Sequence, residues 1–434
     1  MIKNRQNSVV ILSHARTPFG SFLGKLSHLS APQLGSLAIK DSIDKLNIPS
    51  LRVDDVIMGN VISSGLGQAP ARQAAIFSGL NDSTNCLTIN KVCGSGMKSI
   101  MLGAESIKNN HDKIIVSGGM ESMSNAPHYV LKSRKGAKLG DVKQIDGLIH
   151  DGLWDVYNKV HMGNHGESCA KKYKIDRYEQ DDYAEKSYRR AQKAYYSNQI
   201  QNEICKITDK KDNCDLLDEE PFKVDFEKMR ELKSVFKENG TITAANASTI
   251  NDGAAACIMT SEKNALEMGL KIEARILDYC EFSGNPKWFT TAPIFAIKKL
   301  LAKNNLSTTD IDFFEINEAF AVVPIVAIKE LGLDSEKVNI NGGAVSLGHP
   351  IGCSGTRIVT SLINILKYKN KNLGNLLLSS VYIQIVLIFF VFIGIKGSTS
   401  PIKYKNIKEF KKCVYDLKAP ILSDHKPYYR LPWI

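Results

Sequence analysis

The sequence predicts an α/β protein built from two similar halves. Short apolar runs alternate with amphipathic helical patterns along most of the chain, which is typical of a sheet with helices on its faces. Each half also carries an Asn after one strand-like run and a reactive side chain at a later strand-to-helix turn. The two spacings are close, 33 residues from Asn60 to Cys93 and 32 from Asn317 to His349. We therefore expect a duplicated fold, and 434 residues leave room for it with a large core.

In the first half, the run VVIL predicts a strand at residues 9–12 that enters a turn. The segment APQLGSLAIKDSIDKL predicts an amphipathic helix, because Leu34, Leu37 and Ala38 recur near helical spacing. The other elements of this half are a strand in residues 54–62, a strand, Gly-rich turn and helix in residues 84–109, and a strand in residues 113–123.

The second half repeats this rhythm. The pattern predicts a helix in residues 291–304, a strand running into a helix in residues 310–321, and a strand, Gly-rich turn and helix in residues 338–366. Between the halves, roughly residues 121–246 are more polar and richer in Lys, Tyr and Asp. Long elaborated connections often carry binding function, so we interpret this stretch as a large insertion or lid over the site.

Composition excludes several classes of protein. Hydrophobic residues make up 43% of the chain and charged residues 23%, which is ordinary for a globular enzyme and excludes a disordered or collagen-like protein. The formal net charge is +11, but the segment from Lys396 onward contains nine Lys/Arg and three Asp/Glu and so supplies more than half of it. The remaining excess suits small anionic ligands, and no clustered basic helix indicates nucleic-acid binding.

The cysteines and the N-terminus indicate the compartment. Nine cysteines are scattered without a CxxC pair or a Cys/His ligand spacing, which favours a reducing compartment and no zinc site. The first residues show neither an apolar signal-peptide region nor a long Arg/Ser-rich leader. We expect no secretion, and a mitochondrial presequence is not visible.

Cys93 lies between a β-branched run and a predicted helix that starts near Gly96. Unpaired N–H groups and the helix dipole at such a position favour the thiolate. Gly94 and Gly96 would let the backbone approach a bound ligand closely. A buried structural Cys is the alternative, but the flanking GSG turn favours a nucleophile.

His349 lies in the turn of the second half that corresponds to the Cys93 turn. Its surroundings are rich in glycine, which suits a backbone packed against a substrate; these glycines are at positions 342, 343, 348, 352 and 355. His can accept the proton of a nucleophilic thiol or donate a hydrogen bond to a developing oxyanion. A structural His is the alternative reading, and the pairing with Cys93 favours catalysis.

Asn317 and Glu318 follow the apolar run FFEI and add an amide and a carboxylate to the second half. The alternative to a catalytic role is a helix-capping Asn with Glu318 in the first helical turn.

Five motifs in order, INKVCGSGMKS, HMGNHGES, TAANASTINDGAAA, EINEAFA and NGGAVSLGHPIGCSGTRIV, resemble the thiolase family. Within the family the resemblance points to the mitochondrial acetoacetyl-CoA thiolases (acetyl-CoA acetyltransferases) of animals, and it covers the chain from Val9 to about Ile365. It implies two βαβαβαββ halves layered α/β/α/β/α with an inserted loop domain. The implied boundaries are 8–278 for the N-terminal domain, with its loop domain at about 121–246, 279–378 for a truncated C-terminal domain, and 379–434 for an aberrant hydrophobic segment and basic tail.

The resemblance implies a Claisen condensation of two acetyl-CoA to acetoacetyl-CoA, and thiolysis in reverse, as in fatty acid and ketone body metabolism. By this resemblance Cys93 becomes the acyl thioester in a ping-pong cycle. His349 would activate Cys93 and, with a water held by Asn317, form an oxyanion hole. Glu318 would hold the supporting hydrogen bonds.

Binding residues also follow from the resemblance. The implied coenzyme A contacts are Tyr188, Lys223, Val224, Asp225, Lys228 and Ser248, and the acyl pocket would be lined by His161 and Met162. No covalently bound cofactor is implied. The mitochondrial branch binds potassium, and the matching positions are Tyr188, Ala244, Ala245, Ala247 and Val345. A dimer or tetramer is implied, with mitochondrial location as the first expectation and cytoplasmic location as the alternative.

The match stops where the family carries a second cysteine, the base for the α-proton, in a Cys-x-Gly-Gly-Gly segment. In the nearest register Ser379 stands at that position, and no glycine follows until Gly394. A Ser hydroxyl is a poor base near neutral pH. Cys353 and Cys413 are disfavoured as substitutes. A catalytically impaired acyl-CoA-binding protein is therefore the alternative to an active enzyme.

Residues 376–395 are uncharged and have three interpretations. The length just reaches that of a transmembrane helix, but Gln384, the serines and many β-branched residues disfavour an anchor. A buried strand fits the start of the segment. We favour the third interpretation, a retained intron or altered splice end from about Ser379, and we expect the missing last strands to leave an exposed sheet edge.

Overall fold

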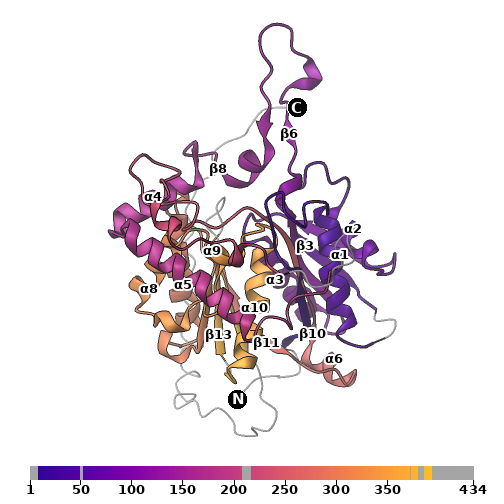
Figure 1. Ribbon diagram of the computed structural model, residues 1–434. Helices are drawn as coiled ribbons and strands as arrows, with labels where there is room; N and C mark the ends of the chain where they lie inside the picture. The colour runs from indigo at the N-terminus through magenta and orange to yellow at the C-terminus, as the bar shows by residue number, and fades with distance from the viewer. Residues whose placement is uncertain (1–7, 49–51, 208–216, 372, 380–385, 393–434) are drawn as a thin grey trace, which may run out of the picture. The chain divides into compact units, whose positions relative to one another are not determined.

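The computed structural model describes residues 8–48, 52–207, 217–371, 373–379 and 386–392 (Figure 1). Its main feature is a ten-stranded sheet among the described residues. The spatial order is β12 (Phe313–Ile316), β13 (Leu373–Ser379), β14 (Val386–Phe392), β11 (Ala274–Cys280), β1 (Val9–Arg16), β10 (Asn251–Ser261), β5 (Ile115–Ser122), β3 (Asp55–Gly59) and β4 (Asn85–Ile89), with β2 (Gly20–Ser21) paired to β10.

The sheet is duplicated about its centre, where β1 pairs antiparallel with β11. Moving outward in the first half, β10 and then β5 are joined by antiparallel pairs, and β3 and then β4 by parallel pairs. Moving outward in the second half, β14 and β13 are joined by antiparallel pairs, β12 by a parallel pair, and Val338 by a parallel bridge to Phe314. The predicted duplication is confirmed by this identical order of pairings.

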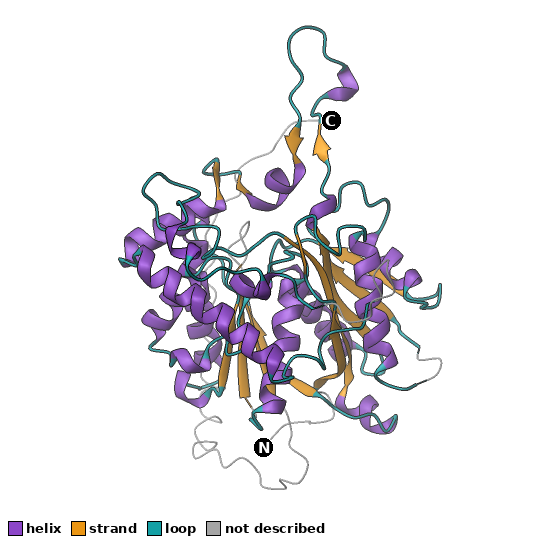
Figure 2. Cartoon of the chain, in the orientation of Figure 1, coloured by secondary structure: helices purple, strands orange, loops and turns teal. Residues whose placement is uncertain are grey.

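The helices form the predicted α/β/α/β/α layers, which Figure 2 shows around the two groups of strands. One outer layer is α1 (Ala31–Asp44) and α2 (Pro70–Phe77), the middle layer is α3 (Ser95–Asn109) and α10 (Ser354–Tyr368), and the other outer layer is α7 (Ala292–Lys303) beside α8 (Val322–Leu331). β1 separates two cores because its side chains alternate. Val9 and Ile11 pack in the core that contains α3 and α10, whereas Val10 and Leu12 pack against α1.

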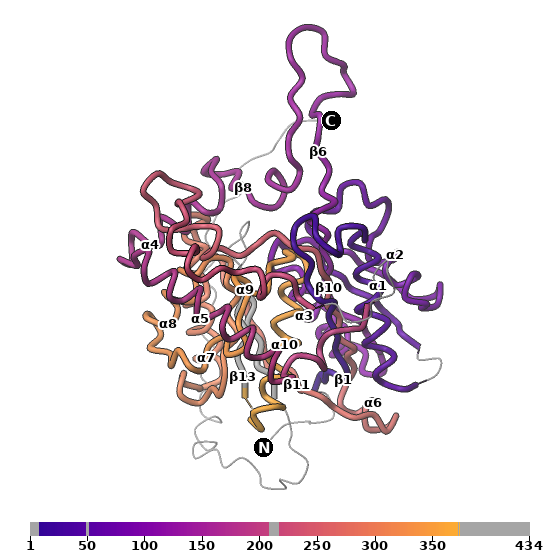
Figure 3. Tube along the Cα trace, viewed as in Figure 1, coloured from indigo at the N-terminus to yellow at the C-terminus, as the bar shows by residue number. Residues whose placement is uncertain are grey.

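The chain between β5 and β10 holds the elements of the predicted insertion. These are β6 (His128–Tyr129), β7 (Ile145–Asp146), β8 (Trp154–Asp155), β9 (Val160–His161), α4 (Met162–Tyr173) and α5 (Arg177–Tyr196). The hairpin of β6 and β7 carries a connection that extends away from the sheets (Figure 3). α4 packs against α8, and α5 packs against α9 (Ala344–Leu347), so the insertion contacts the second half. The predicted domain boundaries stay a prediction.

Smaller helical elements complete the described chain. They are α6 (Glu262–Glu267), η2 (Met123–Asn125), η3 (Ser133–Lys135), η4 (Ile149–Leu153), η5 (Glu220–Phe222), η6 (Lys228–Glu231), η7 (Pro286–Thr291), η8 (Thr308–Asp310) and η9 (Ser335–Lys337).

The middle helices α3 and α10 cross at glycines near their N-termini. A Cβ on Gly96 would lie 2.7 Å from Thr356 Oγ1, and a Cβ on Gly355 would lie 2.3 Å from the Met97 nitrogen. The Thr356 hydroxyl also donates to the Gly96 carbonyl at 2.9 Å. The crossing therefore brings the starts of both helices, and the turns that precede them, to one place.

The uncharged segment forms strands where the structure describes it. β13 and β14 pair with each other, and β14 also pairs with β11, so the sheet continues through the second half. The expected missing strands are thus present, which corrects the expectation of an exposed edge there. The sequence of β14, VLIFFVF, is rich in β-branched and aromatic residues, as strands are. The altered-end interpretation stays a prediction, and residues 380–385 and 393–434 lie outside the described residues.

The described residues contain no helix that could serve as a membrane anchor. None of their helices combines the length and the apolar character that crossing a bilayer requires.

Candidate active site

The Cys93 turn is held in an unusual backbone conformation. Val92 has φ +47°, which costs energy for a β-branched residue. Two hydrogen bonds hold it: the Val92 nitrogen donates to Asn90 Oδ1 at 2.9 Å, and the Ser95 hydroxyl donates to the Val92 carbonyl at 2.6 Å. Because α3 begins at Ser95, this turn places Cys93 just before the helix.

His349 is oriented by its own turn. Its backbone nitrogen donates to Asn251 Oδ1 at 2.9 Å, and its Nδ1 lies 2.6 Å from Ser354 Oγ. The Pro350 carbonyl lies 3.0 Å from the Ser354 hydroxyl and can accept its only proton, so we assign Nδ1–H of His349 as the donor to Ser354 Oγ. This arrangement leaves the lone pair on Nε2. Sequence reasoning missed Ser354, whose only signal is its place at the start of the helix.

The two turns bring Cys93 and His349 together. The Nε2 atom of His349 lies 3.2 Å from the Sγ atom of Cys93, and both residues are buried. Burial raises the pKa of Cys93 to about 12, whereas burial and the Arg357 charge lower the pKa of His349 to about 3. The predicted thiolate is therefore wrong for this state: the thiol keeps its proton beside a neutral imidazole. Deprotonation requires transfer to Nε2 during attack.

Asn317 is buried, yet both of its amide atoms lack a hydrogen-bond partner among the described residues. It precedes α8 without capping it, since the cap is Ala321. An unsatisfied buried polar group costs about 1–3 kcal/mol, so it calls for an explanation. A bound molecule that pairs with the amide is the explanation that the chemistry offers.

Glu318 ties together four segments around the site. It accepts hydrogen bonds from the Tyr183 hydroxyl at 2.9 Å, Asn339 Nδ2 at 2.8 Å, the Ser187 hydroxyl at 2.8 Å and the Val345 nitrogen at 3.1 Å. These bonds join α5, the NEAFA segment, the segment of Asn339 and α9, and so they fix the backbone next to Asn317. The alternative interpretation, in which Glu318 is only an acidic residue in the first turn of a helix, does not account for these four hydrogen bonds.

The predicted acyl-pocket residues lie beside an aromatic wall. The His161 ring stacks on Phe236 with centroids 4.7 Å apart, and Phe236 meets Phe320 edge-on at 5.9 Å. Met162 belongs to the same buried core as Cys93. Burial lowers the pKa of His161, which favours the neutral ring.

The predicted coenzyme A residues fall into two places. Tyr188 is buried with Ala245 and Val345, and Val224 packs against this cluster. Lys228 pairs with Asp225 at 3.0 Å on an exposed loop. Lys223, next to Val224 in the chain, contacts Ser21 and Glu219. Ser248 lies apart from this loop and donates to the Ala319 carbonyl at 3.0 Å, beside Glu318 in the chain.

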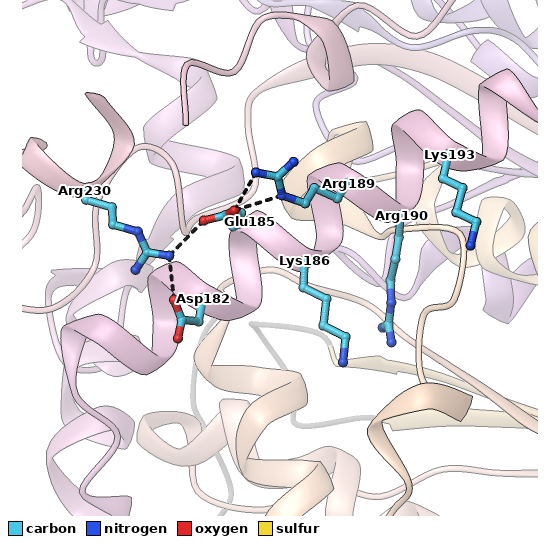
Figure 4. A pocket seen from close by; sticks show the side chains of 7 residues that line it. All are labelled: Asp182, Glu185, Lys186, Arg189, Arg190, Lys193 and Arg230. Carbon is cyan, nitrogen blue, oxygen red and sulfur yellow. Dashed lines mark hydrogen bonds and ion pairs between the residues drawn. The ribbon is translucent and has the colours of Figure 1, made fainter. Parts of the chain in front are cut away.

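A charged hollow of about 420 Å³ lies on the outer face of α5 (Figure 4). Its lining residues are Asp182, Glu185, Lys186, Arg189, Arg190, Lys193 and Arg230. Arg230 pairs with Asp182 and Glu185, and Arg189 pairs with Glu185. Because carboxylates neutralise part of its positive charge, the hollow does not by itself indicate a phosphate site.

The positions predicted to hold potassium also lie near one another. Tyr188, Ala245 and Val345 share one buried cluster. The carbonyl oxygens of Ala244, Ala245 and Ala247 accept no hydrogen bond within the described part of the chain. Burial and then the carboxylates of Glu220 and Glu318 raise the pKa of Tyr188, so the surroundings carry negative potential. Free carbonyls in such a place fit a hard cation.

The glycines of the His349 turn mostly contact protein rather than open space. A Cβ on Gly352 would lie 2.7 Å from Glu121 Oε2, one on Gly343 would lie 2.3 Å from the Glu318 carboxyl carbon, and Gly348 has φ +104°. The close passage of the chain itself is enough to require glycine at these positions. The expected packing of this backbone against a substrate stays a prediction.

The duplication identifies the counterpart of Ser379. In each half, one strand ends just before an Asn: β3 before Asn60 and β12 before Asn317. Each of these strands pairs in parallel with a strand that continues beyond it. The register pairs are Gly59 with Gly119 and Ile316 with Leu377. Two residues beyond these partners stand Glu121 and Ser379. Cys353, by contrast, packs with Phe19 and Ala255 in a separate cluster.

Together, the fold and the site define a class of protein: a duplicated α/β enzyme with a cysteine and a histidine at the N-termini of two crossed helices. Residues 9–263 match the family model of the thiolase N-terminal domain, and residues 270–381 match that of the thiolase C-terminal domain. The chain belongs to the thiolase family.

Curated relatives and solved structures agree with this assignment. The chain is 47% identical over 371 residues to an acetyl-CoA acetyltransferase of Schizosaccharomyces pombe, covering 84% of this chain and 94% of that protein. It is 50% identical over 366 residues to acetyl-CoA acetyltransferase A, mitochondrial, of Xenopus laevis, covering 83% and 87%. A crystal structure of a thiolase from Ascaris suum in complex with coenzyme A superimposes with a TM-score of 0.85 at 41% identity, covering 89% of this chain and all of that one.

Proposed function

We propose that the chain is an acetyl-CoA C-acetyltransferase that condenses two acetyl-CoA to acetoacetyl-CoA and catalyses the reverse thiolysis. The names of its relatives support the reaction, and the Ascaris complex supports coenzyme A as the carrier. The observation that carries the proposal is the buried pair of Cys93 and His349 at 3.2 Å, which the corresponding turns of the two halves bring together.

The first half-reaction follows from this pair. Cys93 Sγ attacks the acetyl carbonyl carbon while its proton passes to His349 Nε2, which Ser354 keeps unprotonated. The bond from carbon to coenzyme A sulfur then breaks, and the leaving thiolate takes the proton from Nε2. The products are acetyl-Cys93 and free coenzyme A, with the imidazole neutral again.

In the second half-reaction a base takes the α-proton of a second acetyl-CoA, which gives an enolate; the family supplies this base as the cysteine that Ser379 replaces here. The enolate α-carbon attacks the acetyl-Cys93 carbonyl carbon, the bond to Cys93 Sγ breaks, and the Cys93 thiolate takes up the proton that the base had removed. In this proposal Asn317 holds a water that, with His349, stabilises the enolate oxygen, and Glu318 keeps that segment in place. The unpartnered Asn317 amide supports the water site.

A catalytically impaired thiolase-like protein is the second candidate, because Ser379 stands where the family has its basic cysteine. Such a protein would bind acyl-CoA and acetylate Cys93 but form no acetoacetyl-CoA. Measuring both products from acetyl-CoA separates the two: acetoacetyl-CoA that disappears in Cys93→Ala supports the enzyme, and its absence despite acetyl-Cys93 supports the second candidate.

For coenzyme A, we propose contacts with Tyr188, Lys223, Val224, Asp225, Lys228 and Ser248, and an acyl pocket beside His161 and Met162. Exposed lysines near the nucleotide phosphates are chemically suitable. Weaker coenzyme A binding by Lys223→Ala and Lys228→Ala, measured calorimetrically, is the expected result.

For potassium, we propose the carbonyl oxygens of Ala244, Ala245, Ala247 and Val345 with the Tyr188 hydroxyl as ligands. A bound cation would stiffen the segment that carries Ser248. Thermal unfolding in K⁺ against the larger tetramethylammonium ion tests the site, since K⁺ should raise the melting temperature and Tyr188→Phe should reduce that effect.

A dimer or tetramer and a mitochondrial location complete the proposal, with a cytoplasmic location as the alternative. The mitochondrial Xenopus relative supports the location. Sedimentation and imaging of the tagged chain are the tests.

A further inference from the structure

Glu121, at the end of β5, is a fully buried carboxylate that accepts four hydrogen bonds. The donors are Asn60 Nδ2 at 2.8 Å, the Val61 nitrogen at 3.0 Å, the Ile62 nitrogen at 3.1 Å and the Gly352 nitrogen at 2.9 Å. Both oxygens are therefore engaged by N–H donors, and a proton on either oxygen would displace one of them.

These donors come from two distant parts of the chain. Asn60, Val61 and Ile62 follow β3 in the first half, whereas Gly352 lies in the second half, three residues after His349. A Cβ on Gly119 would lie 2.0 Å from the Gly352 carbonyl oxygen, so β5 presses directly on this turn. Ile62 and Ile351 lie in the same buried core as Cys93. Glu121 thus joins the wall beside Cys93 to the turn that carries His349.

The duplication adds a second observation. Glu121 is the first-half counterpart of Ser379, because each stands two residues beyond the strand partner of the residue that precedes Asn60 or Asn317. In the first half, the carboxyl end of this strand contacts the turn before the middle helix of the second half. That contact is visible as the bond from Gly352 to Glu121.

We propose that the Glu121 carboxylate is a positioning residue, which holds the His349 turn against the Cys93 turn only while it is ionised. For its effect on acyl transfer, the inference rests on the proposed function. The hydrogen bonds of Glu121 act on the Cys93–His349 pair in the absence of substrate, so they do not depend on that function. Protonation replaces one accepted bond by an O–H group without an acceptor, and the turn is then free to move away from Cys93.

Burial raises the pKa of Glu121 to about 7, and the charge of Asp252 on β10 acts in the same direction. The other titratable groups near Glu121 are His349 and Cys353, in the turn that contains Gly352, and Cys93, which precedes α3. The pKa of His349 is lowered to about 3, those of Cys93 and Cys353 are raised, and Asp252 is also raised by burial. We therefore expect one proton step near neutral pH in the reactivity of Cys93, and we attribute it to Glu121.

The test measures the rate at which iodoacetamide alkylates Cys93 in the full chain without substrate, by peptide mass spectrometry. Glu121→Gln keeps the size of the side chain but presents an amide to N–H donors. We expect its rate at about pH 8 to fall roughly tenfold or more, as loss of hydrogen bonds to a charged group implies. As the pH is lowered, the wild-type alkylation rate should fall in one proton step near pH 7, and the rate of Glu121→Gln should lack that step.

Glu167→Gln is the matched control. Glu167 is also a buried carboxylate that accepts backbone bonds, from Thr241 and Ile242 at 2.8 Å, but it does not contact the His349 turn. Its Cys93 rate and pH step should equal those of the wild type. Alkylation of the half-buried Cys86 reports general loosening and should stay constant in both variants.

Wild-type rate and pH dependence in Glu121→Gln would overturn the proposal, as would an equal loss in Glu167→Gln. If Glu121→Gln does not fold, the wild-type profile decides, since a rate without a step between about pH 5.5 and 8.5 contradicts the proposal. Acetylation by acetyl-CoA is measured in parallel. Its absence in the wild type would count against the proposed function and leave the alkylation result intact.

Discussion

Gly355 of α10 lies so close to Met97 of α3 that a Cβ on Gly355 would stand 2.3 Å from the Met97 backbone nitrogen. The contact sets the separation of the two middle helices, and with it the 3.2 Å between His349 and Cys93, whose turns start these helices.

Gly355→Ala should therefore damage both stability and the site. The added methyl group meets backbone, which cannot swing away, so we expect a loss of about 1–3 kcal/mol in the free energy of unfolding. Urea unfolding measures the loss, and Cys93 alkylation should slow in the folded fraction. Unchanged stability would show that the helices separate easily.

Ser354→Ala tests the orientation of His349. Without the hydroxyl that accepts from Nδ1–H, the imidazole can place its proton on Nε2 and no longer accept one from Cys93. We expect acetylation of Cys93 to slow about tenfold, with little change in the KM for acetyl-CoA. Thr360→Val is the control and should keep the wild-type rate. Thr360 lies in the same helix as Ser354, and its hydroxyl has no hydrogen-bond partner among the described residues.

Asn317→Ala separates a catalytic from a structural amide. Because neither amide atom has a partner within the described chain, its removal should cost little stability, less than about 1 kcal/mol. Thiolysis of acetoacetyl-CoA should fall by about a hundredfold or more, as loss of an oxyanion-hole group does. A large loss in melting temperature with retained thiolysis would contradict the assignment.

The site could be predicted from sequence where the signal is local. The strand-to-helix turns marked Cys93 and His349, and the NEAFA segment marked Asn317. The roles of Ser354 and Glu121 were missed, because their meaning lies in contacts made across a turn or across the two halves. The state of the Cys93 thiol was predicted wrongly, since a helix N-terminus is visible in sequence and burial is not.

The fold shows the same division. The alternation of strands and helices predicted the layers, and the repeated spacing predicted the duplication. The strands of the uncharged segment were less certain, because a run of apolar residues fits a strand or a helix until its neighbours are known. β14 is defined by pairing with β11 and β13, two strands far apart in sequence.

Ser379→Cys tests the altered end of the second half. A thiol has a pKa near 8.5 in water and can act as a base at neutral pH, whereas a Ser hydroxyl cannot. We expect the variant to form acetoacetyl-CoA faster than the wild type, and Ser379→Ala to match the wild type. An equal rate in all three would show that the chain uses another base or none.

His349 should make the free energy of unfolding depend on pH. Its folded pKa of about 3 lies below the unfolded value near 6.5, so the unfolded chain binds the proton more readily. This contribution to stability is present above about pH 6.5 and is lost as pH falls toward 3, at up to about 1.4 kcal/mol per pH unit. In urea unfolding at several pH values, His349→Gln should lose stability less steeply on acidification than the wild type.

The most direct measurement is the mass of the full chain after incubation with acetyl-CoA, followed by peptide mapping. The expected result is one acetyl group on Cys93, formed rapidly in the wild type, slowly in His349→Ala and not at all in Cys93→Ala. A folded wild-type chain whose Cys93 stays unmodified, or acetylation that proceeds equally well without His349, would contradict it.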